Sequence, residues 1–320
     1  MNLSPSSTAP DGPAASFRHE LYPYRGDAQY LEGTLGFIRE ALDADEAIIV
    51  AVPPDRASLL RDELPDEPQV TFVEAATAGV NPGRHVAAWT AWMSERGEGG
   101  RPVRGIGETP WRQARSAAHL SELRYHEWLL NRAFANSSAW SMLCPYDIAG
   151  SDEDALRSVS RCHPEIRKDG RSLRNDGFLG VEEYAFDPLA DACDPFQELV
   201  YTRGDLSAVR SKVAQCAADA GVPAEGRSKL AVAVTEIATN SVRHGGGQGT
   251  LRTWTQDTTF LCEFRDAGHI PDVLAGRTRP TADQLGGRGL WLAHQLCDLV
   301  EIRSTPERGT TIRLHMDVPQ

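Results

Sequence analysis

The sequence predicts two domains: an N-terminal α/β domain built on a parallel sheet, and a C-terminal α+β sandwich. The chain has 320 residues, enough for two domains of about 100–200 residues each. Strand-like apolar runs alternate with helical periodicity in the first half, which is typical of βαβ units. The segment from residue 196 onward carries 14 basic and 14 acidic residues, so the whole net charge of −12 lies in the first 195 residues. Two units with different surfaces are indicated.

The N-terminal domain is predicted to begin near Phe17. Residues 1–16 are rich in Ser, Pro and Ala, which is typical of a disordered tail. The continuous apolar run of residues 47–52 is typical of a strand buried on both faces of a parallel sheet. The other strands are predicted over residues 70–73, 103–106 and 140–144, and the helices over residues 27–42, 56–63, 84–96 and 112–135.

The boundary between the domains is expected within residues 149–197, which show little periodicity apart from a short helix around residues 152–161. We expect a first domain over residues 17–165, its end and a linker over 166–197, and a second domain over 198–318. The strands of the second domain are predicted over residues 199–201, 250–255, 259–265, 300–304 and 310–316. Its helices are predicted over residues 205–221, 224–243 and 288–298. Helices on one face of an antiparallel or mixed sheet form an α+β sandwich.

Composition excludes several classes of protein. Neither half has the basic excess that binding to a phosphate backbone needs. The six cysteines form no CxxC pair, which is typical of a reducing compartment. No apolar run approaches the roughly 20 residues of a membrane helix, and the N-terminus lacks the features of a signal peptide. We expect a cytoplasmic protein that binds neither nucleic acid nor membrane directly.

The helix predicted over residues 224–243 carries the most informative residues. Glu236, Asn240 and His244 recur every four residues, so they share one face of this helix. Alone, such a triplet also fits a solvated helix face.

Three later motifs favour a ligand site over that simpler interpretation. Asp266-Ala267-Gly268 follows an apolar strand, so a carboxylate stands at a strand end beside a permissive backbone. Gly286-Gly287-Arg288-Gly289 enters a helix, and the backbone N–H groups at such a helix start bind anions such as phosphate. Gly309-Thr310 opens the last strand. Four such elements in this order predict a phosphate-bearing ligand.

The segments TEIATNSVRHG, DAG, GGRGLWL and RGTTIRL resemble the N, G1 and G2 boxes and the last strand of the GHKL ATPase domain, which has the Bergerat fold. More narrowly, they are similar to the anti-sigma-factor serine/threonine kinases. The resemblance covers about residues 198–318 and implies ATP and Mg²⁺ as cofactors.

The resemblance also implies a role for each matching residue. Asn240 would hold Mg²⁺, and Glu236 would be the general base that accepts the proton of the attacking hydroxyl. Asp266 would accept the adenine amino group, with Thr310 close to the purine. Three glycines would let the lid approach the phosphates, namely Gly268, Gly287 and Gly289.

Two features depart from the family pattern. Ile270 occupies the second glycine position of the family's DxGxG motif, and the lid over residues 269–285 is short and contains two prolines. Both features favour ATP binding over kinase turnover, so a nucleotide-gated protein-binding module stands as the alternative to a kinase.

The segments HELYPYRGDAQYLEGTLGFIREAL, AIIVAVPP, PVRGIGE, HEWLLNRAF and MLCPYD resemble the MEDS sensory domain, over about residues 17–165. The resemblance implies a RecA-like scaffold that senses a small organic molecule. A RecA-like ATPase would carry GxxxxGK[ST] after its first strand. Pro53-Pro54-Asp55-Arg56 stands there instead, so this domain has no P-loop and we expect it to bind no nucleotide.

Three other groups of residues have alternative interpretations. His126-Glu127 resembles the phosphoacceptor box of sensor histidine kinases, but about 70 residues of other structure separate it from the ATPase region, which disfavours that hypothesis. Cys144, Cys162 and His163 fit no common zinc spacing, so core packing is the preferred interpretation. Five tryptophans enrich the first domain, and core packing is the default interpretation for them, with an apolar ligand pocket as the alternative. They are Trp89, Trp92, Trp111, Trp128 and Trp140.

Together these observations predict a signalling switch in which a sensory domain is coupled to an ATP-binding domain. The resemblance implies phosphorylation of a Ser or Thr on an anti-sigma-factor antagonist, with a sigma factor or that antagonist as the protein partner. A homodimer is a further expectation from the same resemblance.

Overall fold

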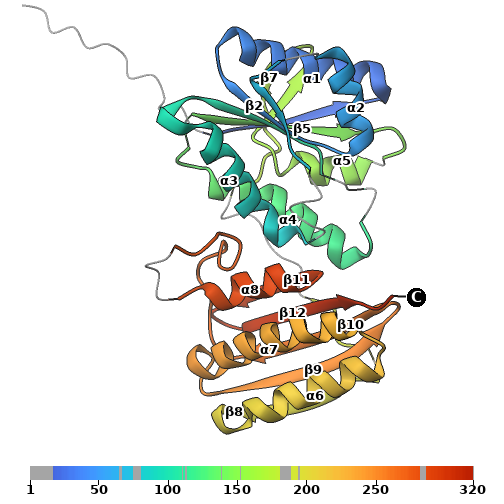
Figure 1. Ribbon diagram of the computed structural model, residues 1–320, viewed down its shortest axis with the longest axis vertical. Helices are drawn as coiled ribbons and strands as arrows, with labels where there is room; N and C mark the ends of the chain where they lie inside the picture. The colour runs from blue at the N-terminus through green and yellow to red at the C-terminus, as the bar shows by residue number, and fades with distance from the viewer. Residues whose placement is uncertain are drawn as a thin grey trace, which may run out of the picture.

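The computed structural model describes most of the chain, namely residues 17–64, 67–74, 81–109, 111, 114–137, 139–151, 153–180, 189–193, 195–281 and 286–319. The tail expected over residues 1–16 and residues 282–285 of the expected lid lie outside these ranges. The chain forms two domains that follow one another along the long axis of the molecule (Figure 1).

The first domain contains a seven-stranded sheet in the order β3-β2-β4-β5-β1-β6-β7. Its strands are β1 (Arg18–Tyr24), β2 (Ala47–Ala51), β3 (Val70–Phe72), β4 (Val103–Gly107), β5 (Trp140–Asp147), β6 (Glu165–Lys168) and β7 (Arg171–Arg174). The sequence predicts β2 to β5 but not β1, which lies inside the sheet between β5 and β6.

The sheet is mixed, which corrects the predicted parallel sheet. Each strand pair is parallel except β6 and β7, which are antiparallel. Asp169 and Gly170 form the turn between them and both have positive φ, 47° and 71°. A two-residue turn of this kind joins antiparallel strands, whereas a parallel pair needs a long crossover. The sheet therefore continues to Arg174.

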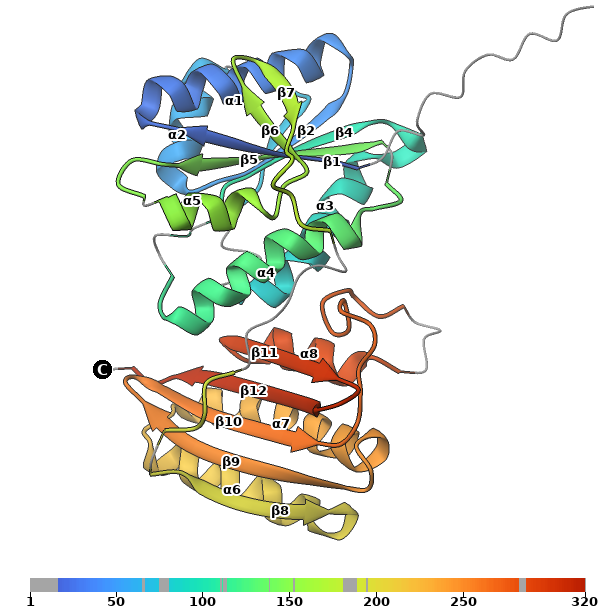
Figure 2. The same ribbon diagram turned by 180° about the vertical axis from the view of Figure 1, so that it is seen from behind.

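Helices cover both faces of this sheet (Figures 1 and 2). One face carries α1 (Gly26–Asp43) and α2 (Pro54–Glu63), and the other carries α3 (His85–Arg96), α4 (Ala117–Ala133) and α5 (Glu153–Ser160), with two short 3₁₀ turns, η2 (Pro82–Arg84) and η3 (Glu98–Gly100). Strand β2 is fully buried, as its apolar run predicts. Ile48 and Val50 face the core under α1, and Ile49 and Ala51 face the core under α3 and α4.

The second domain is an antiparallel five-stranded sheet in the order β11-β12-β10-β9-β8. Its strands are β8 (Gln197–Thr202), β9 (Gln248–Gln256), β10 (Thr259–Asp266), β11 (Leu299–Thr305) and β12 (Gly309–Asp317). Its helices are α6 (Leu206–Asp219), preceded by η6 (Arg203–Asp205), α7 (Ala224–His244) and α8 (Arg288–Leu296). All three helices lie on one face of the sheet, which is the predicted α+β arrangement (Figure 2).

One apolar core joins the helices of the second domain to its sheet. Leu230, Val234 and Ile237 form the buried stripe of α7, and they share a core cluster with Phe264 of β10 and Leu314 of β12. This packing fixes the position of the partly buried residues beside the stripe, Glu236 and Asn240.

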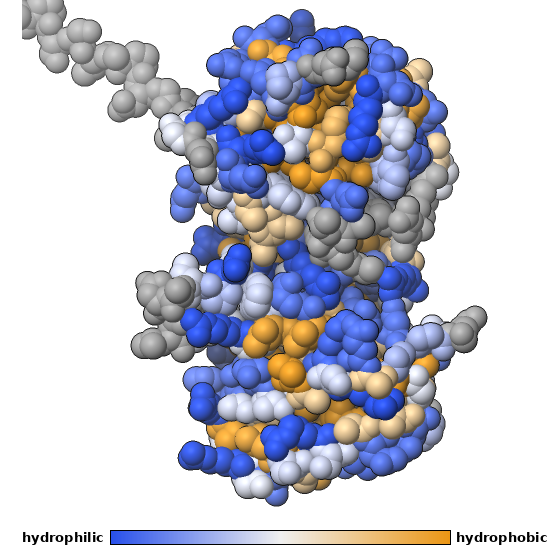
Figure 3. Space-filling model, in the orientation of Figure 1, coloured by the Kyte–Doolittle hydropathy of each residue, from blue (hydrophilic) through white to orange (hydrophobic). Residues whose placement is uncertain are grey.

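The domains meet where α4 and η2 of the first approach α8 and β11 of the second (Figure 1). On the face drawn in Figure 3, hydrophilic residues cover most of the surface and the apolar residues form separate patches on the two domains. Among the helices within the described ranges, none has the length and apolar character to cross a membrane.

Candidate functional site

The candidate site in the second domain is built on α7. Glu236 and Asn240 lie one turn apart on this helix and are both partly buried, beside the apolar stripe. The helix ends at His244, where the backbone N–H of Gly245 donates to the carbonyl of Ser241 at 2.8 Å.

Helix α8 begins directly against these two side chains. Gly287 precedes it in the left-handed conformation, with φ of 84°, which favours glycine. A Cβ at Gly289 would lie 2.9 Å from Oε2 of Glu236 and 3.1 Å from Nδ2 of Asn240, closer than ordinary contact. Glycine at this position therefore allows the N-terminus of α8, where the first backbone N–H groups are not used by the helix itself, to stand beside a carboxylate and an amide.

The remaining predicted residues gather at the ends of β10 and β12. Oδ1 of Asp266 accepts a hydrogen bond from the backbone N–H of Gly268 at 2.8 Å, and the Thr310 hydroxyl donates to the Gly268 carbonyl at 2.8 Å. A Cβ at Gly245 would lie 2.4 Å from Cγ of Asp266, and one at Gly268 would lie 2.6 Å from the His244 carbonyl oxygen. The end of α7 is therefore packed on the Asp266 loop.

The seven predicted residues thus form two adjoining groups along the last turns of α7. The first group comprises Glu236, Asn240, Gly287 and Gly289, and the second Asp266, Gly268 and Thr310. His244 contributes its backbone to this contact, while its side chain is exposed.

The lid contacts the rest of the second domain at Ile270 and at Gly276. The backbone N–H of Ile270 donates to the Ser304 hydroxyl at 2.8 Å, and its side chain packs against the core of the second domain. Farther along the lid, a Cβ at Gly276 would lie 2.6 Å from Cβ of Leu290. The extra side chain at Ile270 therefore anchors the loop where the family pattern has glycine.

These residues fit a magnesium–nucleotide complex. Hard cations such as Mg²⁺ prefer oxygen ligands, which the Asn240 amide supplies. Backbone N–H groups at the start of α8 suit phosphate oxygens, and Gly287 has the left-handed conformation from which the helix starts. The Asp266 carboxylate provides a hydrogen-bond acceptor at the opposite end of the site.

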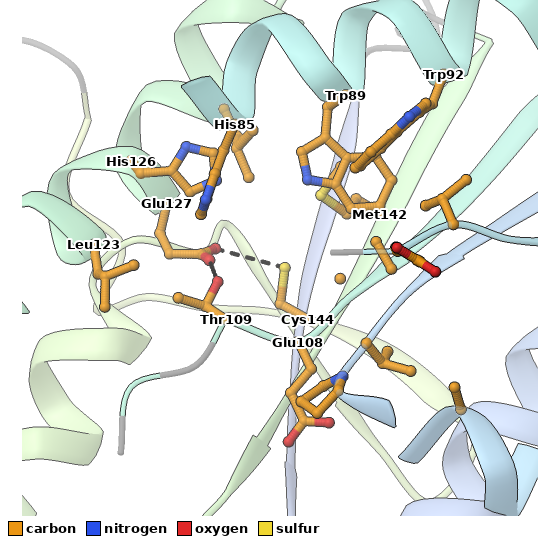
Figure 4. A pocket seen from close by; sticks show the side chains of 18 of the residues that line it. His85, Trp89, Trp92, Glu108, Thr109, Leu123, His126, Glu127, Met142 and Cys144 are labelled. Carbon is orange, nitrogen blue, oxygen red and sulfur yellow. Dashed lines mark hydrogen bonds between the residues drawn. The ribbon is translucent and has the colours of Figure 1, made fainter. Parts of the chain in front are cut away.

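The first domain contains a separate cavity of about 670 Å³ (Figure 4). It lies at the carboxyl ends of β2 and β4, where open α/β sheets commonly bind ligands. Trp89, Trp92 and Met142 provide apolar walls, so two of the five N-terminal tryptophans line this cavity. Glu127 and Cys144 provide polar groups from α4 and β5.

Burial governs the ionisable groups around this cavity. It raises the pKa of Glu108 to about 7, although Tyr24 donates a hydrogen bond to that carboxylate at 2.7 Å. It raises the pKa of the Cys144 thiol well above the ordinary range. Burial also lowers the pKa of His126 well below the ordinary range, and the His85 ring packs edge-on against it at 4.7 Å between centroids.

Glu127 and His19 line or border this cavity, and the sequence assigns neither residue to a ligand site. The sequence places Glu127 only beside His126 in a resemblance to a phosphoacceptor box, and His126 is buried. His19 lies in β1, a strand that the sequence does not predict. No local spacing links either residue to Cys144, so only the fold brings them together.

Comparison with family models finds two matches. Residues 18–164 match the MEDS family, described as the MEthanogen/methylotroph, DcmR Sensory domain, and residues 201–316 match the histidine kinase-like ATPase domain. No curated protein matches the chain.

Two solved structures show partial similarity. The RsbU and RsbW domains of Rv1364c from Mycobacterium tuberculosis are 18% identical over 39% of this chain and 33% of that one, with a TM-score of 0.29. The histidine kinase AdeS from Acinetobacter baumannii is 10% identical over 39% of this chain and 68% of that one, with a TM-score of 0.24. The chain thus spans about a third of the length of the first of these proteins. The two family models thus match the two domains in turn, the MEDS model the first domain and the histidine kinase-like ATPase model the second.

Proposed function

We propose that this protein is a signalling regulator in which the MEDS domain controls an ATP-binding domain of the anti-sigma-factor type. The ATP-binding domain would phosphorylate a Ser or Thr on a protein antagonist and so regulate transcription through a sigma factor. The observation that carries this proposal is the packing of Gly289 on Glu236 and Asn240, which brings a carboxylate, a side-chain amide and the start of a helix together. The first domain would be a RecA-like scaffold that senses a small organic molecule without a P-loop.

The proposed reaction gives each residue a defined task. Magnesium, held by Asn240, would neutralise the phosphate charge. Glu236 would accept the proton of the substrate hydroxyl as its oxygen bonds to the γ-phosphorus and the bond to ADP breaks. Asp266 would accept the adenine amino group beside Thr310, and the backbone at the start of α8 would hold the phosphates.

Helix α4 supports a route by which the first domain would act on the lid. The buried Glu122 carboxylate accepts hydrogen bonds from Arg277 of the lid at 2.7 Å and from Arg303 of β11 at 2.8 Å. The Arg277 guanidinium also lies 4.8 Å from the centre of the Tyr125 ring. Val273 of the lid packs against the core of the first domain.

The same helix faces the cavity. Leu123, His126 and Glu127 line it, within one or two turns of Glu122 (Figure 4). A ligand that shifts α4 would therefore move the groups that hold the lid.

A second contact joins the first domain to α8. Asn81 and Arg84, at the η2 turn, donate hydrogen bonds to the carbonyls of His294 and Cys297 at the end of α8, at distances of 2.7–3.3 Å. These donors satisfy carbonyls that a helix end leaves unpaired. The first domain would thus hold the far end of the helix whose start faces the phosphates.

The alternative function is a nucleotide-gated protein-binding module without turnover. The hydrogen bond from Ile270 to Ser304 favours it, because it ties down the loop where the family pattern has a flexible glycine. The histidine kinase is disfavoured further, because His126 is buried.

The test is calorimetric titration of the full chain with Mg-ATP, followed by incubation with labelled ATP and candidate antagonist proteins. We expect Asn240→Ala to abolish Mg-ATP binding. Glu236→Gln should keep binding but lower transfer by at least about 100-fold, within the range expected for a general base. The matched control is Glu225→Gln, in the first turn of the same helix, which should change neither.

Binding with transfer to Ser or Thr supports the kinase. Binding without transfer supports the nucleotide-gated module. An Asn240→Ala protein that binds Mg-ATP like the wild type contradicts both, because the site would then lie elsewhere.

A further inference from the structure

Four side chains with metal-binding atoms meet in the core of the first domain. They are His19 of β1, Glu127 of α4, Cys144 of β5 and His163, which precedes β6. Each is buried, and their ligand atoms all lie within 4.8 Å of one another.

Four of the six separations between the ligand atoms match those of a tetrahedral metal site. Nε2 of His19 lies 3.2 Å from Sγ of Cys144 and 3.5 Å from Oε2 of Glu127. Oε2 of Glu127 lies 3.5 Å from Nε2 of His163 and 3.6 Å from Sγ of Cys144. Zinc bonds of about 2.0–2.3 Å at tetrahedral angles put neighbouring ligand atoms about 3.3–3.6 Å apart.

The hydrogen bond of His19 to Asn131 directs the lone pair of its Nε2 atom toward the other ligand atoms of the cluster. Its Nδ1 lies 3.1 Å from Oδ1 of Asn131. The Asn131 amide nitrogen donates to the carbonyls of Cys162 and Trp128, so its oxygen is the free acceptor. His19 therefore donates through Nδ1, and its neutral ring presents the lone pair of Nε2 to Glu127 and Cys144.

Hydrogen bonds outside the cluster also orient His163 and Glu127. Nδ1 of His163 lies 2.9 Å from the carbonyl oxygen of Val159, which accepts only, so the lone pair of Nε2 faces Glu127. The other oxygen of Glu127 accepts a hydrogen bond from the Thr109 hydroxyl (Figure 4). Histidines that bind metals commonly donate their second ring N–H to a carbonyl or carboxylate in this manner.

A buried carboxylate that faces imidazole lone pairs needs a positive charge between them. Nε2 of His163 has no hydrogen-bond partner in the described part of the chain, although it is fully buried. Leaving such groups unpaired away from water is costly. A metal cation at the centre of the cluster would satisfy the carboxylate, the two imidazole lone pairs and the sulfur of Cys144 together.

We propose that His19, Glu127, Cys144 and His163 bind a divalent transition-metal ion, with Zn²⁺ as the best match. Imidazole nitrogen and thiolate sulfur select such metals over Mg²⁺ and Ca²⁺, which prefer oxygen. Glu127 and Cys144 also line the cavity, so the ion would stand in the cavity wall. It would be available to a ligand of the sensory domain that carries a metal-binding atom.

Cys162 is the contrasting cysteine in the same core. Its sulfur lies 3.7 Å from the carbonyl oxygen of Arg124 and 3.6 Å from that of Ser158. It belongs to the same apolar cluster as Cys144 but is not among the four converging ligands. Cys162→Ser therefore provides a matched control for loss of a buried thiol.

The test uses the full chain without nucleotide, stripped of metal by a chelator and carrying Cys193→Ser to remove the exposed thiol. The stripped protein is titrated with Co²⁺ under absorption spectroscopy and then with Zn²⁺ in competition. We expect one Co²⁺ per chain, with the visible bands of tetrahedral cobalt and a thiolate-to-cobalt charge-transfer band. Cys144→Ser should lose the charge-transfer band, whereas Cys162→Ser should keep it.

We also expect the variants to differ from the parent protein in their affinity for Zn²⁺. Loss of a partner outside the coordination sphere costs about 10–100-fold in affinity, so we expect Cys144→Ser and His163→Gln to weaken Zn²⁺ binding by at least about 100-fold. If these variants fail to fold, X-ray absorption of the zinc-loaded parent protein decides, with one sulfur among four ligands expected.

Three results would overturn the proposal. They are failure of the stripped parent protein to bind Co²⁺ or Zn²⁺, an unchanged cobalt spectrum in Cys144→Ser, and a zinc shell without sulfur. The first would leave the cluster as a set of polar core residues that contact one another without a metal.

Discussion

Gly289 is the residue on which the geometry of the candidate nucleotide site depends most directly. Its missing side chain lets α8 approach Glu236 and Asn240, and a methyl group there would lie 2.9 Å from the Glu236 carboxylate. Helix propensity alone favours alanine over glycine by about 1 kcal/mol, so stability and function make opposite demands at this position.

Gly289→Ala is therefore expected to lower Mg-ATP affinity by at least about tenfold while leaving the thermal unfolding temperature equal or higher. The added methyl group displaces the Glu236 carboxylate and the Asn240 amide. Calorimetry and thermal unfolding of the same preparation measure both effects.

Gly286→Ala is the control for this prediction. A Cβ at Gly286 meets no atom within 4 Å, and its backbone is not left-handed. Equal losses of ATP affinity in the two variants would show that the close approach at Gly289 is irrelevant to binding.

At the scale of elements, α4 connects the two domains. Its Glu122 is buried, and the Arg277 guanidinium that it pairs with is almost fully buried too. Removing one partner of a buried ion pair leaves an uncompensated charge and costs about 3–5 kcal/mol, far more than an exposed pair.

Glu122→Gln is expected to destabilise the full chain by about 3 kcal/mol. The control is Glu198→Gln, which breaks the more exposed pair with Arg252 and should cost less than about 1 kcal/mol. Urea unfolding followed by tryptophan fluorescence compares them. A Glu122→Gln protein as stable as the control would mean that this contact does not hold the domains together.

At the scale of the whole molecule, the contacts of α4 and η2 predict that the ATP site and the first domain respond to one another. Energetic coupling between two sites is reciprocal, so a cavity that influences the lid is itself influenced by nucleotide. The lid contacts α4 through Arg277, and α8 contacts η2 through the carbonyls of His294 and Cys297.

Saturating Mg-ATP is therefore expected to change hydrogen exchange in α4 and η2 as well as in the lid and α8. Helix α1 is the internal control, because it lies on the face of the first sheet that points away from α4 (Figure 1). Exchange measured by mass spectrometry reports local opening in each segment. Changes confined to the second domain would argue against coupling through this interface.

The sequence predicts the helices and strands of the second domain more completely than those of the first. In the second domain, the predicted α-helices and strands agree with the structure to within a few residues, because the helices are strongly periodic and Gly221 and Gly245 follow two of them, α6 and α7. In the first domain, β1, β6 and β7 were missed. RHELYPY mixes charged and aromatic residues, and the Asp169-Gly170 turn signal lies among polar residues without an apolar run beside it.

The sequence by itself determined which residues belong to the candidate nucleotide site. Glu236 and Asn240 share a helix face because the α-helix repeats every 3.6 residues, and glycines at a helix start suit phosphate wherever that helix packs. These relations are local, so they can be determined without the fold.

Only the tertiary structure decided the rest. His19, Glu127, Cys144 and His163 meet because β1 inserts between β5 and β6, and Glu122 meets Arg277 because α4 faces the second domain. Such contacts join segments that are far apart in the chain, and they depend on strand order and domain packing, which no local pattern of residues encodes.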